Sequence, residues 1–297
     1  MQTQSAAQNK KLFLYGMILS MLTWGISWTC GKIISSYGDA YSIGFFRFLI
    51  TVLSLLPLLL LIKENILIRR SGIPLLIVAA TFMSIYNYLF LEGLRHGQPG
   101  AAGVLVTTLN PIISFVIGLF LDKRKPSVLE IVGIIAGIIA GAVLLQVWVN
   151  WNNVLQPGNL YFVLAPLAWA LLSLATAKSS NHGSPLAFSL WVYALASMIL
   201  LALSNKQDVI AVIEKSDSLF WINMIFSATI TTAIATTFFF YATSKIGASQ
   251  ASSFVFLVPL SAAIGAWVFV NETIKTHTII GGLIGILAVY LLQKKKN

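Results

Sequence analysis

Hydrophobic residues fill long stretches of the chain, and polar residues gather in the short segments between them. Each stretch is close to the roughly 20 residues that a helix needs to cross a bilayer. The pattern predicts ten membrane-spanning helices, and the gaps between them are too short for a soluble domain. The predicted spans are 12–34, 41–62, 73–95, 100–121, 127–148, 158–178, 185–204, 218–243, 248–270 and 276–292. We therefore expect one all-α integral membrane domain over residues 1–297.

Composition agrees with this interpretation and sets the orientation. Only 9% of the 297 residues are charged, against about 25% in soluble domains. The net charge of +10 could indicate nucleic-acid binding, but 13 Lys and Arg residues fall in the termini and even-numbered loops and 4 in the odd-numbered loops. Such a bias marks cytoplasmic segments. We expect a multi-pass protein of the cell (inner or plasma) membrane with both termini in the cytoplasm and no nucleic-acid partner.

Nothing in the sequence predicts an enzyme. The three histidines, His96, His182 and His277, lie far apart at loops or span ends, and Cys30 is the only cysteine. Metal and catalytic sites need clusters of such residues at short spacing. No glycine-rich phosphate-binding loop with a lysine is present either. We expect no cofactor and no metal.

An internal repeat divides the chain into residues 12–148 and residues 158–292. Leu109-Asn110-Pro111 is matched by Leu257-Val258-Pro259, and Trp24 by Trp169. Gly133 and Gly137 likewise recur as Gly281 and Gly285. Each half has five predicted spans, an odd number, so the second half enters the membrane from the opposite face. Inverted repeats of this kind permit alternating access to a central site.

The chain resembles the drug/metabolite transporter superfamily, in particular its ten-span EamA-type members, over nearly its whole length. The resemblance rests on Trp24-Gly25, Arg47, Pro111, Pro259 and Asn271-Glu272. It implies efflux of small metabolites such as amino acids. One departure concerns Glu272, which lies 13 residues after Pro259, whereas Arg124 lies 13 residues after Pro111. The first half cannot use that acid in the same way.

Three charged residues inside predicted spans are the first candidates for solute contact, because such charges are costly unless they serve a function. Lys32, Arg47 and Glu92 all fall in the outer half of their spans. Together they would leave a net positive charge that attracts a carboxylate or another anion. Alternatively, Lys32 and Glu92 reach the membrane interface, and Arg47 holds spans together.

Trp24, Trp28 and Lys32 are spaced by four residues, with Ser27 alongside, and therefore share one helical face. Indole rings below an ammonium group would suit a solute with a carboxylate and an apolar body. The alternative is that the tryptophans pack against neighbouring helices.

Polar and aromatic residues of other spans are expected to face the same cavity or to bond to a neighbouring helix. These are Tyr86, Asn87, Phe90, Thr107, Asn110, Trp169, Thr232, Thr236 and Tyr241. Pro111 and Pro259 are predicted helix breaks or hinges, since proline frees a backbone carbonyl one turn earlier; kinking for packing is the alternative.

Glycines spaced by four residues occur in spans five and ten. Small residues at this spacing let helices approach closely. They are expected to pack within the chain, and a homodimer through these spans is the alternative.

These observations predict a secondary or facilitative transporter that exports a small metabolite, with an amino acid as the first candidate. Its partners would be the small-molecule solute and the lipid bilayer. The alternatives are an importer of a nucleobase, nucleotide-sugar or organic anion, and a membrane receptor or subunit that does not transport.

Overall fold

The structure, a computed structural model, describes residues 2–121, 123, 125–149, 155–247, 251 and 253–293. Within this part of the chain every regular element is a helix, and one isolated β-bridge joins Ile68 to Gly183. The all-α prediction is therefore confirmed for the described residues.

The first half contains five long helices whose ends are fixed by local sequence signals. They are α1 (Gln2–Ile34), α2 (Ala40–Leu61), α3 (Ile73–His96), α4 (Pro99–Leu121) and α5 (Val128–Leu145), with the short 3-10 helix η1 (Arg70–Gly72) before α3. Asp39 caps α2 by accepting from the backbone of Tyr41 and Ser42. Ser127 and Glu130 form a capping box at the start of α5.

The second half contains more helical segments, and several of them are short. Its elements are α7 (Pro157–Ala177), η2 (Ser179–Asn181), α8 (Pro185–Leu203), α9 (Lys206–Lys215), α10 (Ser218–Ile225), the π-helix η3 (Phe226–Thr236), α11 (Thr237–Ile246), η4 (Ser253–Leu257), α13 (Val258–Val270) and α14 (Thr276–Gln293). Proline stands in the first turn of α7, α8 and α13, where its missing N–H leaves no hydrogen bond unmade.

Eight helical segments of the described chain are long and apolar enough to cross a bilayer. Two further apolar helices, Val258–Val270 and Thr276–Ala288, are shorter, and they correspond to predicted spans nine and ten. The ten-span count therefore stays a prediction. The helix α9 was not predicted, because its ten residues lie in a polar gap between spans.

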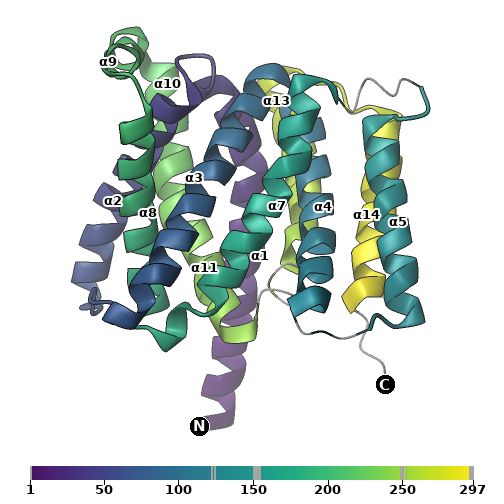
Figure 1. The fold of residues 1–297 in the computed structure, drawn as a ribbon, viewed down its shortest axis with the longest axis horizontal. Helices are drawn as coiled ribbons and strands as arrows, with labels where there is room; N and C mark the ends of the chain where they lie inside the picture. The colour runs from purple at the N-terminus through teal and green to yellow at the C-terminus, as the bar shows by residue number, and fades with distance from the viewer. Residues whose placement is uncertain are drawn as a thin grey trace.

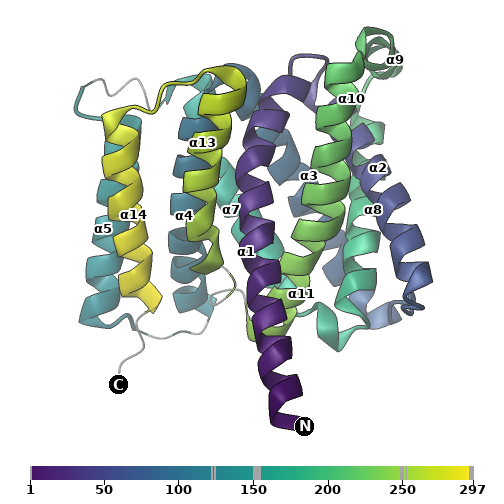
Figure 2. The same ribbon diagram turned by 180° about the vertical axis from the view of Figure 1, so that it is seen from behind.

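The helices stand side by side as a flat bundle (Figures 1 and 2). The pair α5 and α14 forms one edge, and α2 and α8 lie toward the other edge (Figure 1). The helix α1 starts at the end marked N and runs to the opposite end, here called the distal end, whereas α7 starts at the distal end (Figure 1). The last described residues of α14 return to the end where α1 starts.

Gly25 allows α1 and α13 to approach each other closely. A Cβ atom at this position would lie 2.6 Å from the backbone nitrogen of Ala262 and would overlap Ser261. Backbone cannot move aside as a flexible side chain can, so only glycine fits. The close packing of α1 against α13 thus explains why glycine follows Trp24.

The glycines of α5 and α14 face neighbours in the same chain. A Cβ atom on Gly141 would lie 3.3 Å from Leu109, and one on Gly281 would lie 2.6 Å from Leu144. These contacts join α4, α5 and α14. An interface between two copies of the chain would have to use the isoleucine-rich exposed faces of α5 and α14, and the homodimer stays a prediction.

We predict that Gly25→Ala lowers the unfolding temperature of the detergent-purified protein by about 2–10 °C, since overpacking costs about 1–3 kcal/mol. Gly118→Ala is the matched control, because nothing lies within 4 Å of its new methyl group and alanine favours the helix. An unfolding temperature of Gly25→Ala equal to that of the control would contradict the close approach of α1 and α13.

Candidate solute-binding site

A small cavity lies among helices of both halves, and most of the predicted binding residues line it. Its volume is about 40 Å³, which is room for about three water molecules. A site that encloses a small molecule usually has roughly 300 Å³ or more, so the cavity is too small to hold a metabolite in this conformation. The lining residues are Trp24, Ser27, Trp28, Arg47, Tyr86, Phe90, Val106, Thr107, Asn110, Trp169, Thr231, Thr236 and Val255.

Arg47 of α2 is the one charged residue among the described residues that line the cavity. Its side chain is buried, with 8% relative exposure for the residue. Nη1 donates to Oδ1 of Asn87 on α3 and Nη2 donates to Oγ1 of Thr232 on η3, both at 3.2 Å. The guanidinium carbon lies 5.2 Å from the centre of the Phe90 ring.

None of these contacts neutralises the charge of Arg47. Both hydrogen-bond acceptors are neutral, and the ion pairs found in the described part of the chain involve Glu92 instead. Removing a charge from water costs several kcal/mol unless an opposite charge compensates it. The cavity is therefore a site where an anion would be stabilised.

Three polar atoms of lining residues have no hydrogen-bond partner among the residues that the structure describes: Nε of Arg47, Nε1 of Trp169 and Oγ1 of Thr231. Buried polar atoms without a partner are rare and call for a specific explanation. The first two atoms can only donate. A group that satisfies them must supply acceptor oxygens, as a carboxylate does.

Five aromatic rings form most of the remaining wall. The rings of Trp24 and Trp169 meet edge to face with centres 5.1 Å apart, and Tyr86 lies 4.7 Å from Trp169. Trp28 lies 4.9 Å from Phe90. The prediction that Trp24 and Trp28 share one face of the first span is confirmed, because both line the cavity. Such rings can hold an apolar body, and their faces also attract cations.

The π-helix η3 positions the polar side of the cavity. The hydroxyls of Thr232 and Thr236 each donate to the backbone carbonyl five residues earlier, at 2.8 and 2.9 Å. Their oxygens accept from Arg47 and from Nε1 of Trp24, the latter at 3.1 Å. π-Helices are rare and frequent at functional sites. Both threonines were predicted to face the cavity or a neighbouring helix, but the π-helix was not predicted.

Lys32 lies outside the cavity lining and caps the end of α3. Its Nζ donates to the backbone oxygens of Leu94, Arg95 and Gly97 at 2.7, 3.3 and 3.0 Å. A cation is favourable at this end of a helix. These bonds join α1 to α3, a structural role that was not among the predictions for Lys32; its predicted contact with solute stays a prediction.

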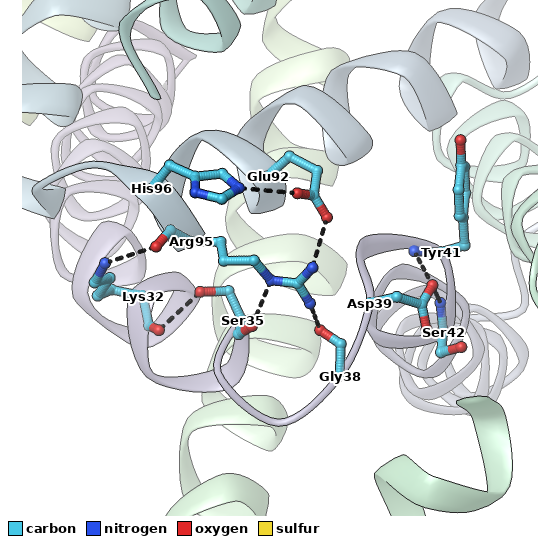
Figure 3. Close-up of polar contacts among 9 residues, drawn as sticks. All are labelled: Lys32, Ser35, Gly38, Asp39, Tyr41, Ser42, Glu92, Arg95 and His96. Carbon is cyan, nitrogen blue, oxygen red and sulfur yellow. Dashed lines mark hydrogen bonds and ion pairs between the residues drawn. The ribbon is translucent and has the colours of Figure 1, made fainter. Parts of the chain in front are cut away.

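Glu92 does not line the cavity either and belongs to a polar network with Arg95 and His96 (Figure 3). Its carboxylate pairs with Arg95 at 3.1 Å and lies 3.7 Å from His96. Arg95 in turn donates to the backbone oxygens of Ser35, at 3.4 Å, and Gly38. The network fastens the loop between α1 and α2 to α3.

The same loop is held from the other side by α10. The hydroxyl of Tyr37 donates to Oδ1 of Asp217 at 2.8 Å, and the backbone N–H of Phe220 donates to the same oxygen. The bond from Phe220, followed by that from Tyr37, lowers the pKa of Asp217, and the bond to Asp217 raises the pKa of Tyr37. The contact is therefore fully formed at neutral pH and weakens as acid protonates Asp217.

Tyr241 and the two predicted helix breaks have different surroundings. Tyr241 is half-buried on α11, with Nζ of Lys245 5.4 Å from its ring, and does not line the cavity. The helix α4 continues through Pro111, so this proline does not break the helix here; prolines are tolerated in spans where neighbours satisfy the freed groups. Pro259 stands where the 3-10 helix η4 changes to α13.

Six of the ten predicted binding residues thus line one cavity, and Asn87 bonds to Arg47 beside it. Their role in binding stays a prediction. Val106, Thr231 and Val255 also line the cavity and were not predicted. No polarity marks the two valines in the sequence, and Thr231 could have been inferred only from the π-helical turn of η3.

The family comparison covers nearly the whole chain. Residues 12–146 and 156–293 match the model of the EamA-like transporter family. The uncharacterized transporter YyaM of Bacillus subtilis (strain 168) is 23% identical over 288 residues, which cover 94% of this chain and 93% of that protein. The uncharacterized transporter YetK of the same organism is 23% identical over 285 residues, covering 93% and 86%.

A WAT1-related chloroplastic protein of Arabidopsis thaliana is 23% identical over 210 residues, which are 68% of this chain and half the length of that protein. A solved crystal structure superposes with a TM-score of 0.64 at 16% identity, covering 95% of this chain and 97% of that one. The fold is therefore shared with a known structure. By its match to the family model over both halves, the chain belongs to the EamA-like transporter family and is a multi-pass membrane transporter.

Proposed function

We propose that this protein exports a small metabolite that carries a carboxylate and an apolar body, with an amino acid as the first candidate, by alternating access. The observation that carries the proposal is the buried charge of Arg47, which has no acidic partner in the described chain and faces an aromatic cavity. The carboxylate would accept from the guanidinium of Arg47, in place of Asn87 and Thr232, and from Nε1 of Trp169, which lacks a partner. The hydrogen bonds of a carboxylate to a guanidinium are among the strongest in proteins.

The aromatic wall supports the second part of the proposal. Trp24, Tyr86 and Trp169 would enclose an apolar side chain. The described lining contains no acid for the ammonium group of an amino acid, so that group would lie against the aromatic faces. The same absence makes an organic anion without an ammonium group the second candidate.

The helix packing supports two inverted repeats over residues 12–148 and 158–292. In such a repeat α1 corresponds to α7, α3 to η3 and α4 to α13. The contact of α3 with α7 then has its counterpart in the contact of η3 with α1. The contact of α1 with α13 has its counterpart in the contact of α7 with α4. Each of these pairs is in contact. The matching tryptophans Trp24 and Trp169 meet at the cavity, as expected for a site on the repeat axis.

Phe162 and Trp28 are candidates for a gate between the cavity and the distal end. Phe162 lies 6.2 Å from Trp28, which lines the cavity. Phe162 also lines a hollow of about 330 Å³ together with Gln98, Gln146 and His277. The proposal is that these two rings part when the transporter opens toward the outside.

The proposed function is tested by flux of radiolabelled L-phenylalanine and the other amino acids in proteoliposomes. We expect flux of at least one amino acid, with inhibition by its competitors. Phenylacetate flux without amino acid flux would favour the organic anion. Binding without any flux would indicate a receptor, and neither binding nor flux would contradict the proposal.

We predict that Arg47→Gln weakens inhibition of this flux by L-phenylalanine at least about tenfold, because a charged hydrogen bond to a carboxylate is lost. Inhibition by L-phenylalaninamide, which lacks the carboxylate, should weaken less than about twofold. Arg95→Gln is the control, since Arg95 lies outside the cavity. Equal losses for both compounds would point to a structural role of Arg47.

The proposed orientation predicts which loops face the outside of the cell. In a Cys30→Ser background, a membrane-impermeant maleimide applied to intact cells should label Lys206→Cys but not Lys63→Cys or Lys178→Cys. All three positions are exposed, so access should depend on the side of the membrane. Labelling of Lys63→Cys in intact cells would overturn the cytoplasmic placement of the termini, and labelling of only one of Lys63→Cys and Lys178→Cys would overturn the inverted repeat.

A further inference from the structure

Arg47 keeps two hydrogen-bond acceptors in a conformation whose cavity is too small for a solute. The cavity of about 40 Å³ also cannot hold the hydration shell of a guanidinium, since it has room for only about three water molecules. Closing the protein without solute therefore removes water from a charged group. Protein atoms must then supply part of the compensation for the charge of Arg47.

The two acceptors are arranged to do this from both halves of the molecule. Oδ1 of Asn87 belongs to α3, and Oγ1 of Thr232 belongs to η3, each 3.2 Å from a terminal nitrogen of Arg47. The hydroxyl hydrogen of Thr232 is already donated to the backbone oxygen of Ser227 at 2.8 Å. The lone pairs of this oxygen are thus directed to accept from Arg47.

Building on the proposed function, we infer that Asn87 and Thr232 are surrogate ligands that take the place of the solute carboxylate when the transporter is empty. They lower the free energy of the closed, empty state relative to the open states, in which water solvates Arg47. The empty protein can then pass through the closed state and return. The transporter is consequently capable of net transport and is not an obligate exchanger.

Thr232 is the more informative of the two, because its bond to Arg47 crosses between the halves. Loss of this bond raises the free energy of the closed, empty state. It does not affect the closed, loaded state, where the solute carboxylate holds the guanidinium. Net efflux, which needs the empty return, should therefore slow, whereas exchange of internal for external solute, which does not need it, should continue. Thr232 is in this sense a positioning residue for the return step.

The test uses the full-length protein in proteoliposomes loaded with tritiated L-phenylalanine. Net efflux is measured into buffer without solute, and exchange is measured into buffer with saturating unlabelled L-phenylalanine. We expect Thr232→Val to lower the ratio of net efflux to exchange by about tenfold, the effect of one lost hydrogen bond to a charged group. Thr232→Ser retains the hydroxyl and should restore the ratio.

Thr51→Val is the matched control. The hydroxyl of Thr51 donates to the backbone oxygens of Arg47, at 2.8 Å, and of Ala228, at 3.0 Å, and so also joins α2 to η3. It does not touch the guanidinium of Arg47. Its loss should leave the ratio unchanged. If Thr232→Val does not fold, Asn87→Ala removes the other acceptor and should lower the ratio in the same direction.

The outcomes separate this inference from the proposed function. A low ratio in Thr232→Val with a normal ratio in Thr51→Val and Thr232→Ser would support surrogate ligands. Equal ratios in all variants, or exchange without net efflux in the unaltered protein, would overturn the inference and leave the proposed function intact. Absence of both fluxes in the unaltered protein, for L-phenylalanine and for every other amino acid and phenylacetate, would overturn both.

Discussion

The burial of one guanidinium group without an acidic partner is the constraint on which the rest of this structure depends. A charge at the bilayer interior is costly and is retained where it serves a function. In the described chain Arg47 is held by neutral oxygens and an aromatic face rather than by a carboxylate. The compensation is incomplete, so an anion that enters the cavity is stabilised more than a neutral solute of the same shape.

The fold makes this arrangement possible by bringing helices from both parts of the chain around one point. The helices α1, α2, α3 and α4 contribute residues from the first part, and α7, η3 and η4 contribute residues from the second. The π-helix η3 supplies hydroxyls to Arg47 and Trp24. The distal network around Arg95 instead fastens loops and helix ends (Figure 3). Arg47 at the cavity and Arg95 in this network thus have different surroundings.

Hydropathy alone predicted the helices well, because long apolar segments leave few alternatives in a bilayer. Spacing also predicted the cavity faces of Trp24 and Trp28. The roles of Lys32 and Glu92 could not be distinguished from that of Arg47. A sequence shows that a charged residue lies in a span, but not which group forms a hydrogen bond or an ion pair with it. The π-helix escaped prediction because its turn differs from an α-helix by only one residue.

The most direct measurement is an experimental structure of the protein with 4-iodo-L-phenylalanine, whose iodine marks the ring. The account predicts the carboxylate within hydrogen-bond distance of Arg47, the ring among Trp24, Tyr86 and Trp169, and the guanidinium released from Thr232. A ligand bound elsewhere, with Arg47 still held by Asn87 and Thr232, would contradict it.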